Sequence, residues 1–240
     1  MRIVLDEIEF TKEKVKVFSG ISCSFKTGVT YVIGNNGAGK SELLKIISTA
    51  IIPDKGTITY TKLIRDKKVG TYRKHLSTEE VRKVVGFMPQ HFTGYPEMTI
   101  ERYLTYMAFQ KGIPHKLIKS LLNEWVTDAN LVELKRRKLR NLSGGERQKV
   151  GLIQALINQP RICILDEPFE GLDTQEKHFF NRAIQRLSFH SVIIISTHLV
   201  EEIERSIDVS ILNMENGELS YINSVDELSE MKSLLTNIEK

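Results

Sequence analysis

Apolar and polar residues alternate along the first 33 positions of the chain, in the runs RIVLDEIEF, SGISCSF and VTYVI. Alternation with a period of two is typical of β-strands that bury one face. The charged run TKEKVK and Gly28 separate these runs as turns. The pattern therefore predicts a β-layer at the start of the chain.

The pattern then changes to that of a helix. Apolar residues at positions 43, 44, 46 and 47 have helical spacing, and Pro53 and Gly56 mark a turn into another strand. From about 97 to 139 the texture is again helical, with interruptions at Gly112 and Pro114. This part of the chain predicts a helical insert.

Two apolar runs, RICILD and SVIIIST, flank the helical pattern TQEKHFFNRAIQRL. A strand, a helix and a second strand in this order indicate a βαβ unit, and hence a parallel sheet. The segment VSILNMENGELSYIN predicts a hairpin at Asn216 and Gly217, with an acidic helix after it. We expect an α/β fold in one domain over residues 1–240, because no repeat, linker or low-complexity tract interrupts the chain.

Charge and composition narrow the class of partner. Apolar residues make up 41% and charged residues 27% of the chain, and 34 basic against 30 acidic residues give a net charge of +4. This small excess is spread along the chain, so no nucleic-acid partner is expected. The run KRRKLR at 135–140 is interpreted as a solvated surface. The stretch TKLIRDKKVGTYRKHLSTEE is interpreted as a long, basic, solvated loop or as a surface that touches lipid headgroups or a partner.

Cys23 and Cys163 lie in apolar segments without the spacing of metal ligands, which favours small buried side chains in a reducing, cytoplasmic setting. The opening MRIVLDEIEF turns acidic too early for a secretory signal. Purely apolar stretches such as residues 192–195 are far too short to span a membrane. If the protein serves a membrane, a partner is expected to supply the membrane part.

The run GNNGAGKS matches G-x-x-x-x-G-K-[ST], with an apolar strand before it and a helical pattern after it. Its glycines allow backbone N–H groups to turn around phosphate oxygens at a helix N-terminus. The alternative is a structural glycine turn. The predicted phosphate-binding residues are Gly34, Asn35, Asn36, Gly37, Ala38, Gly39, Lys40 and Ser41.

Phosphoryl transfer needs charge on the β- and γ-phosphates, a metal ion and an oriented water. Lys40 is expected to reach the β- and γ-phosphates, and the Ser41 hydroxyl to coordinate Mg²⁺. The buried strand RICILDEP ends in Asp166, expected to hold Mg²⁺, and Glu167, expected to polarise the water. The alternative, an exposed acidic turn before Pro168, does not explain the apolar strand.

The run NLSGGERQKVGL at 141–152 carries a second candidate anion site, because a serine hydroxyl and glycine N–H groups stand at a helix start. With it the chain resembles the nucleotide-binding subunit of an ATP-binding cassette (ABC) transporter. Six motifs occur in the family's order: the phosphate loop, GFMPQ at 86–90, the signature LSGGE at 142–146, ILDEP, EGLD at 170–173 and STH at 196–198.

The resemblance implies a P-loop NTPase core with a mixed or parallel sheet, an N-terminal antiparallel β-layer, and a helical subdomain over about 91–158. It implies that Gln90 touches Mg²⁺ or water, and that His198 contacts the γ-phosphate beside Glu167. It also implies that Asp173 shapes the contact between two subunits. The signature residues expected to bind nucleotide are Ser143, Gly144, Gly145 and Glu146.

The family also has an aromatic residue that stacks on adenine. Phe10 is our candidate, and Phe18 is the alternative, although its place in the pattern favours the core.

The function implied is that of an ATP-binding and ATP-hydrolysing subunit, with ATP and Mg²⁺ as cofactors. It powers transport, with export preferred, through a separate integral-membrane subunit. ATP would be sandwiched in a homodimer or heterodimer of ATPase subunits, peripheral on the cytoplasmic face of the membrane. A soluble ABC-type ATPase outside transport is the alternative. A GTPase or nucleotide kinase is a third possibility, but no N-K-x-D motif occurs and the signature would go unexplained.

Glu42 departs from the family pattern, in which most members have a threonine after the Mg²⁺ ligand. Two unit charges about 8 Å apart repel by about 2 kcal/mol at an effective dielectric near 20, whereas an acid in a helix's first turn gains about 0.3–1 kcal/mol. The carboxylate is therefore expected to turn away from the phosphates, toward solvent or a cation such as Lys45, while its N–H serves the nucleotide. A tuning role and a bystander role both remain open.

Overall fold

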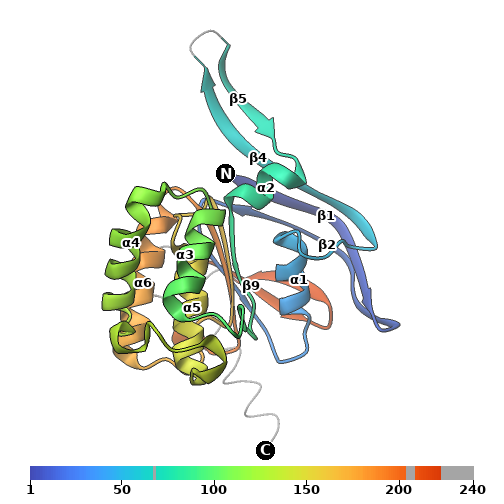
Figure 1. Cartoon of the computed structure of the whole chain (residues 1–240). Helices are drawn as coiled ribbons and strands as arrows, with labels where there is room; N and C mark the ends of the chain where they lie inside the picture. The colour runs from blue at the N-terminus through green and yellow to red at the C-terminus, as the bar shows by residue number, and fades with distance from the viewer. Residues whose placement is uncertain (67–68, 204–208, 223–240) are drawn as a thin grey trace, which may run out of the picture.

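The computed structural model describes residues 1–66, 69–203 and 209–222. Two β-sheets form its framework (Figure 1). The first is antiparallel with strand order β2-β1-β4-β5. Its strands are β1 (Arg2–Lys12), β2 (Val15–Lys26), β4 (Lys55–Asp66) and β5 (Gly70–His75).

The second sheet is mixed, with strand order β10-β9-β3-β8-β7-β6. Only the β9–β10 pair is antiparallel. Every residue of β7 and β8 is buried, because helices or the other sheet cover both faces. The strands are β3 (Gly28–Ile33), β6 (Val85–Met88), β7 (Ile162–Asp166), β8 (Val192–Thr197), β9 (Val209–Glu215) and β10 (Glu218–Ile222).

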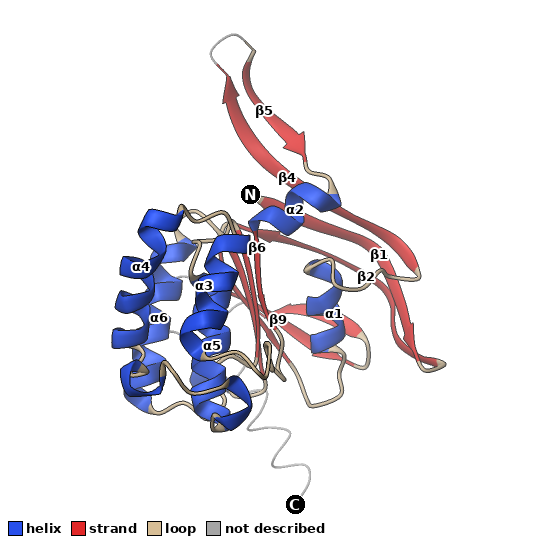
Figure 2. Ribbon diagram, viewed as in Figure 1, coloured by secondary structure: helices blue, strands red, loops and turns tan. Residues whose placement is uncertain are grey.

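Helices cover the mixed sheet from two sides (Figure 2). α1 (Lys40–Ile47) packs between the two sheets, with Leu43 and Ile47 in a core shared with Ile3 and Val32. On the other side a second core joins the sheet to four helices, α3 (Ile100–Gln110), α4 (His115–Asp128), α5 (Gly144–Leu156) and α6 (Thr174–Ser188). The shorter elements are α2 (Thr78–Val84), η1 (Val132–Leu134), η2 (Leu139–Asn141) and η3 (Val200–Glu202).

The α/β fold with an antiparallel layer and a parallel region is confirmed, with one change of membership. The third predicted strand, β3, leaves the N-terminal layer and pairs with β8 and β9 in the mixed sheet. Its place in the first layer is taken by β4 and β5, which lie later in the chain. Strand pairing depends on contacts distant in sequence, so period-two alternation does not assign a strand to a sheet.

The basic stretch after residue 60 was interpreted as a solvated loop or as a surface that touches lipid headgroups or a partner, and the interpretation as a loop is wrong. β4 continues to Asp66, β5 returns antiparallel to it, and α2 follows with Ser77 as its N-cap. All six residues of β5 are exposed, so no buried face imposes an apolar alternation on the sequence. The pattern therefore had no signal for this pair of strands.

Other turns follow their local chemistry. Asn216 and Gly217 have φ of 49° and 78°, the left-handed geometry that a tight hairpin between β9 and β10 needs, as predicted. Pro114 stands at the N-cap of α4 and ends the preceding helical pattern. The predicted acidic helix at the C-terminus lies outside the described residues. No helix among the described residues is long and apolar enough to cross a membrane.

Candidate functional site

The phosphate loop connects the carboxyl end of β3 to the first turn of α1. Gly39, the N-cap of α1, has a φ of 99°, and an added Cβ would lie 2.7 Å from a methyl carbon of Val17. Gly34 has a φ of 150°, and a Cβ there would lie 2.2 Å from the carbonyl oxygen of Met214. Glycine is thus required at both positions, by backbone angle and by close packing.

A cavity of about 590 Å³ opens beside this loop. Three segments line it: β2 at Val15–Val17, the loop at 33–38, and the β9–β10 hairpin at 213–217. Phe10 is not among the lining residues, and its ring packs 5.9 Å from that of buried Phe18. Phe10 as the adenine-stacking residue stays a prediction.

Lys40 is held inside the loop that precedes it. Its ammonium donates hydrogen bonds to the carbonyl oxygens of Gly34, at 2.8 Å, and Asn35, at 3.1 Å. The same nitrogen lies 3.7 Å from Oε1 of Glu167, and each of these two side chains is only 6% exposed. A buried lysine at the centre of the loop therefore faces the carboxylate predicted to act on water.

Asp166 and Glu167 follow the buried strand β7 and are tied to the end of β8 by Ser196. The Ser196 hydroxyl donates to Oδ1 of Asp166 at 2.6 Å and accepts from the backbone N–H of Glu167 at 2.9 Å. Oδ2 of Asp166 is buried and has no hydrogen-bond partner among the described residues. Because a buried carboxylate oxygen without a partner is costly, this atom fits a cation ligand.

Glu167 has a φ of 47°, in the left-handed region that a non-glycine residue seldom adopts. Gln148, from the signature helix α5, donates to its backbone carbonyl at 2.8 Å and helps to hold this conformation. Nδ1 of His198 lies 3.1 Å from Oε2 of Glu167. The structure therefore brings Lys40, Glu167 and His198 together from three separate elements.

The signature residues stand at the start of α5. Ser143 accepts from the N–H of Glu146 at 3.2 Å, and the Glu146 carboxylate accepts from the N–H of Ser143 at 2.8 Å, a reciprocal cap. Gly144 and Gly145 line a cavity of about 320 Å³ together with Gln90. None of residues 34–41 lines this cavity, so the signature and the phosphate loop of one chain form two separate sites.

Asp173 caps α6 in the same reciprocal way, with Glu176 as its partner. The second oxygen of Glu176 accepts from Nζ of Lys149 at 2.6 Å, so α5 and the start of α6 are joined. The carboxylate of Asp173 thus has a capping function, and its predicted role between subunits stays a prediction.

Glu42 pairs with Lys12 at the end of β1, with Nζ 2.7 Å from Oε1. The carboxylate thus pairs with a cation, as expected, but the partner is not Lys45, the example suggested by helical spacing. A residue 30 positions away in the sequence takes its place, because the antiparallel layer folds over the first turn of α1. Burial opposes the charged form of Glu42, but the hydrogen bond from Lys12, a backbone hydrogen bond and the charges of Lys12 and Lys45 together lower the pKa of this carboxyl.

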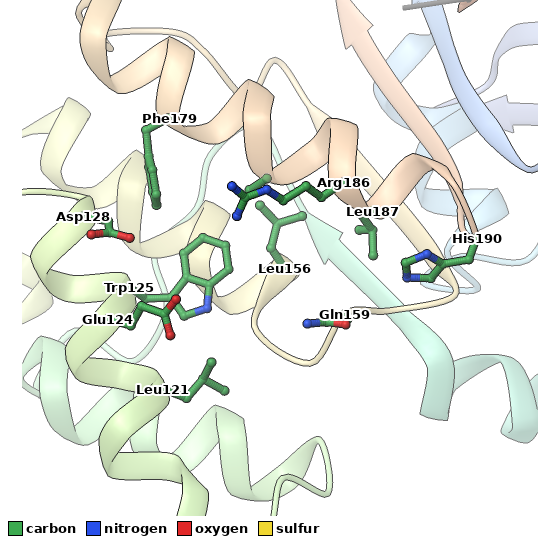
Figure 3. A pocket seen from close by; sticks show the side chains of 11 residues that line it. Leu121, Glu124, Trp125, Asp128, Leu156, Gln159, Phe179, Arg186, Leu187 and His190 are labelled. Atoms are coloured by element: carbon green, nitrogen blue, oxygen red, sulfur yellow. The ribbon is translucent and has the colours of Figure 1, made fainter.

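A further cavity, of about 270 Å³, lies elsewhere, between α4 and α6. Figure 3 shows Trp125 of α4 beside Phe179 and Arg186 of α6. The ring centroids of Trp125 and Phe179 lie 5.8 Å apart. No predicted site residue lines it. Cys23 and Cys163 are not part of either site, and burial raises the pKa of each thiol to about 12.

Several residues that build the site had no assigned role in the sequence. Ser196 belongs to the STH motif, but its bridge between Asp166 and Glu167 depends on the pairing of β7 with β8. Gln148 stands between Arg147 and Lys149 in a polar run of α5, so its burial had no sequence signal. The contribution of the β9–β10 hairpin had no sequence signal, because it comes from a distant segment.

A family model described as ABC transporter matches residues 18–170. The chain belongs to the ABC transporter family. It is an ABC-type ATP-binding ATPase, and the motifs described above are those of its family.

Three ABC relatives illustrate the degree of similarity. The chain is 30% identical to the ABC transporter ATP-binding protein YxlF of Bacillus subtilis, over 86% of this chain and 64% of that protein. It is 30% identical to NatA of the same organism, over 91% and 86%. It is 33% identical to the Nod factor export ATP-binding protein I of Burkholderia orbicola, over 80% and 61%. The chain thus spans less than two thirds of two of these relatives.

Solved structures of ABC proteins share the fold. An ATP-binding subunit of an ABC transporter superposes with a TM-score of 0.79 at 23% identity, covering 98% of this chain and 94% of that one. A dimeric ATP-binding cassette bound to ADP and phosphate superposes with a TM-score of 0.74 at 21% identity, covering 91% and 96%. Cassettes with this fold are thus known to dimerise.

Proposed function

We propose that this chain hydrolyses ATP at a composite site and powers transport through a separate membrane subunit. The observation that carries the proposal is the convergence of Lys40 and His198 on the two oxygens of Glu167. A carboxylate held in place by these two groups, and released by Lys40 when nucleotide binds, is positioned to accept a proton from an attacking water.

The phosphates would lie against the N–H groups of the loop and of the first turn of α1, where the helix dipole favours negative charge. Lys40 would exchange its bonds to Gly34 and Asn35 for bonds to the β- and γ-phosphates. Leaving the loop carbonyls would also remove the ammonium from Glu167, so that this carboxylate becomes free to accept from water.

Ser41, Asp166 and Gln90 are the residues that would hold Mg²⁺. The unpartnered, buried Oδ2 of Asp166 fits this role. When bound, the ion supplies charge neutralisation on the phosphate oxygens. Ser196 fixes the other oxygen of Asp166, and so orients the free one.

We infer that the catalytic unit is a dimer. The phosphate loop and the signature line different cavities of one chain, so a nucleotide in contact with both needs a second subunit. Ser143, Gly144, Gly145 and Glu146 would meet the nucleotide of the partner subunit, and Asp173 would lie at the contact. Residues 91–158 would move as a helical unit, with Gln90 at its start.

Export is the direction we propose, because one relative is an export ATP-binding protein by name. An integral-membrane subunit would bind the ATPase at the cytoplasmic face of the membrane. The second candidate, an ABC-type ATPase outside transport, would act with the same residues but without such a partner.

Two measurements separate these possibilities. The purified chain should hydrolyse ATP in the presence of Mg²⁺, and Lys40→Ala should lose nucleotide affinity. A tagged chain isolated from detergent-solubilised membranes of its own host should bring with it a polytopic membrane protein, in amounts comparable to the chain itself. Hydrolysis together with recovery of the chain only in soluble assemblies would favour the second candidate.

A further inference from the structure

The longest protrusion of the molecule is a two-stranded ribbon built by residues 61–66 of β4 and 69–75 around β5, here called the basic ribbon. β1 pairs with β4 only as far as Thr61, opposite Arg2. Beyond that point β4 pairs with β5 alone, up to Asp66 opposite Gly70. Figure 1 shows the ribbon projecting past the rest of the antiparallel sheet.

The basic ribbon contributes little to the core. Three of its apolar side chains are exposed, with Val69 75%, Leu63 49% and Tyr72 44% accessible to solvent, whereas Ile64 is half-buried. A two-stranded ribbon without a covered face is only marginally stable in water. The fold gains little from these exposed apolar side chains. A partner surface that covers them would account for their presence.

The charges of the basic ribbon are mostly positive. Its described residues include the cations Lys62, Arg65, Arg73 and Lys74, against one acid, Asp66. Of these four cations, only Lys74 forms an ion pair within the described part of the chain, with Glu80 at 2.7 Å. The strand register places Lys62 directly opposite Lys74, a pairing that repels. Such an arrangement favours an anionic partner.

The cations also occupy both faces of the ribbon. Because side chains alternate along each strand, Arg65 and Arg73 share one face with Leu63, whereas Lys62 and Lys74 share the other with Tyr72. A rigid partner would contact the cations of one face only. A fluid layer of anionic headgroups can contact both faces, while exposed apolar side chains enter the interface.

The ribbon lies away from the ATP site. It leads through α2 directly into the start of β6, so it lies at the amino ends of the parallel strands. The phosphate loop, Glu167 and His198 lie at the carboxyl ends. A contact made by the ribbon would therefore leave the nucleotide site and its proposed dimer face unobstructed.

We propose that the basic ribbon binds the headgroups of an anionic membrane surface. This contact is separate from any membrane subunit, and it would place the ATPase against the lipid beside its transporter. It can be tested on the chain alone, so its failure and that of the proposed function are distinguishable.

The test is co-sedimentation of the full chain with vesicles of phosphatidylcholine alone or with about a third phosphatidylglycerol. We expect binding to the anionic vesicles only, and its loss as the ionic strength rises from about 0.1 to 0.5 M. The double variant Arg65→Glu/Arg73→Glu should reduce partitioning by at least about tenfold. ATP affinity should remain at the wild-type value, which shows that the variant is folded.

The matched control is Lys116→Glu/Lys119→Glu, which makes the same change of net charge on exposed residues of α4. It should retain nearly all of the vesicle binding. Equal loss in both variants would overturn the proposal, because net charge alone would then explain binding. Equal binding to neutral and anionic vesicles would also overturn it. The proposal would also be overturned if the chain did not bind vesicles but bound DNA or an acidic polypeptide through the same two arginines.

Discussion

Nζ of Lys12 lies 2.7 Å from Oε1 of Glu42, so that the end of β1 is joined to the first turn of α1. Glu42 lies two positions after Lys40, and Lys12 two positions after Phe10. The ion pair therefore joins two segments that carry predicted nucleotide-binding residues. It also places a cation on the acid that follows the phosphate loop.

The first prediction is that Lys12, and not Glu42 alone, sets the effect of this acid on ATP affinity. Lys12→Ala should weaken ATP binding by several-fold to about thirtyfold, because it leaves a carboxylate near the phosphates. Glu42→Thr should change affinity little, and Lys12→Ala/Glu42→Thr should recover most of the loss. Calorimetric titration of the four proteins measures this cycle. Additive effects would mean that the pair does not act on the nucleotide.

The same pair has a predictable dependence on pH. The pKa of Glu42 is lowered in the folded chain, so its contribution to stability is present above the unfolded pKa and is lost as pH falls through the folded value. The difference in unfolding free energy between wild type and Glu42→Gln should therefore be constant near neutral pH and shrink in acid. Denaturant melts across this range test it, and a difference that grows in acid would contradict the assignment.

Glu167→Gln should retain ATP binding and lower turnover by at least about a hundredfold, because an amide cannot accept the proton of water. The amide can still bond His198, so the local structure should persist. Steady-state hydrolysis and nucleotide titration give the two readouts. Turnover at the wild-type rate would remove Glu167 from the role of base.

Ser196→Ala should remove the bridge between Asp166 and Glu167 and lower both stability, by about 1–3 kcal/mol, and turnover. Ser191→Ala is the matched control, because Ser191 is equally buried and donates to the carbonyl of Pro160. The control should lose similar stability but keep its turnover once folded. Equal kinetic losses in the two variants would show that Ser196 acts only through stability.

Ser143→Arg should leave ATP binding by monomers intact and block closure of the dimer, because a long cation would fill the signature surface. The variant also loses a helix cap, a cost of about 1 kcal/mol. Ser77→Arg loses an equivalent cap on α2 and should still dimerise. Sedimentation with ATP in the Glu167→Gln background compares the two, and a closed Ser143→Arg dimer would contradict the sandwich.

Trp125, the single tryptophan, should report motion of the helical unit. It lies on α4 within residues 91–158 and packs against Phe179 of α6, outside them. ATP with Mg²⁺ should shift its fluorescence emission, and Lys40→Ala should abolish the shift. An emission unchanged by saturating ATP would indicate that α4 and α6 move together.

The sequence could predict those parts of the site in which neighbouring residues act together. The run from Gly34 to Ser41 needs only its own glycines and the helix start to form an anion site. Asp166 and Glu167 follow from an apolar strand that ends in acid, and Ser143 with Glu146 from the reciprocal cap. Local backbone chemistry suffices for each of these.

The predictions that were wrong concern partners far apart in the chain. Lys45 was expected beside Glu42 because helical spacing was the only geometry that the sequence offers, yet the folding of the β-layer brings Lys12 there instead. The start of β4 was predicted as a strand, but its end and all of β5 were interpreted as a loop, because an exposed ribbon carries no buried alternation.

The sequence by itself therefore determined the family and the fold class, and it predicted local sites for phosphate, metal and water. Only the tertiary structure decided that Lys40 faces Glu167, that Ser196 joins the two acids, that Glu42 is neutralised, and that a basic ribbon projects from the fold. The physical reason is that short-range patterns fix backbone geometry, whereas charge partners and exposed surfaces follow from strand pairing between distant segments.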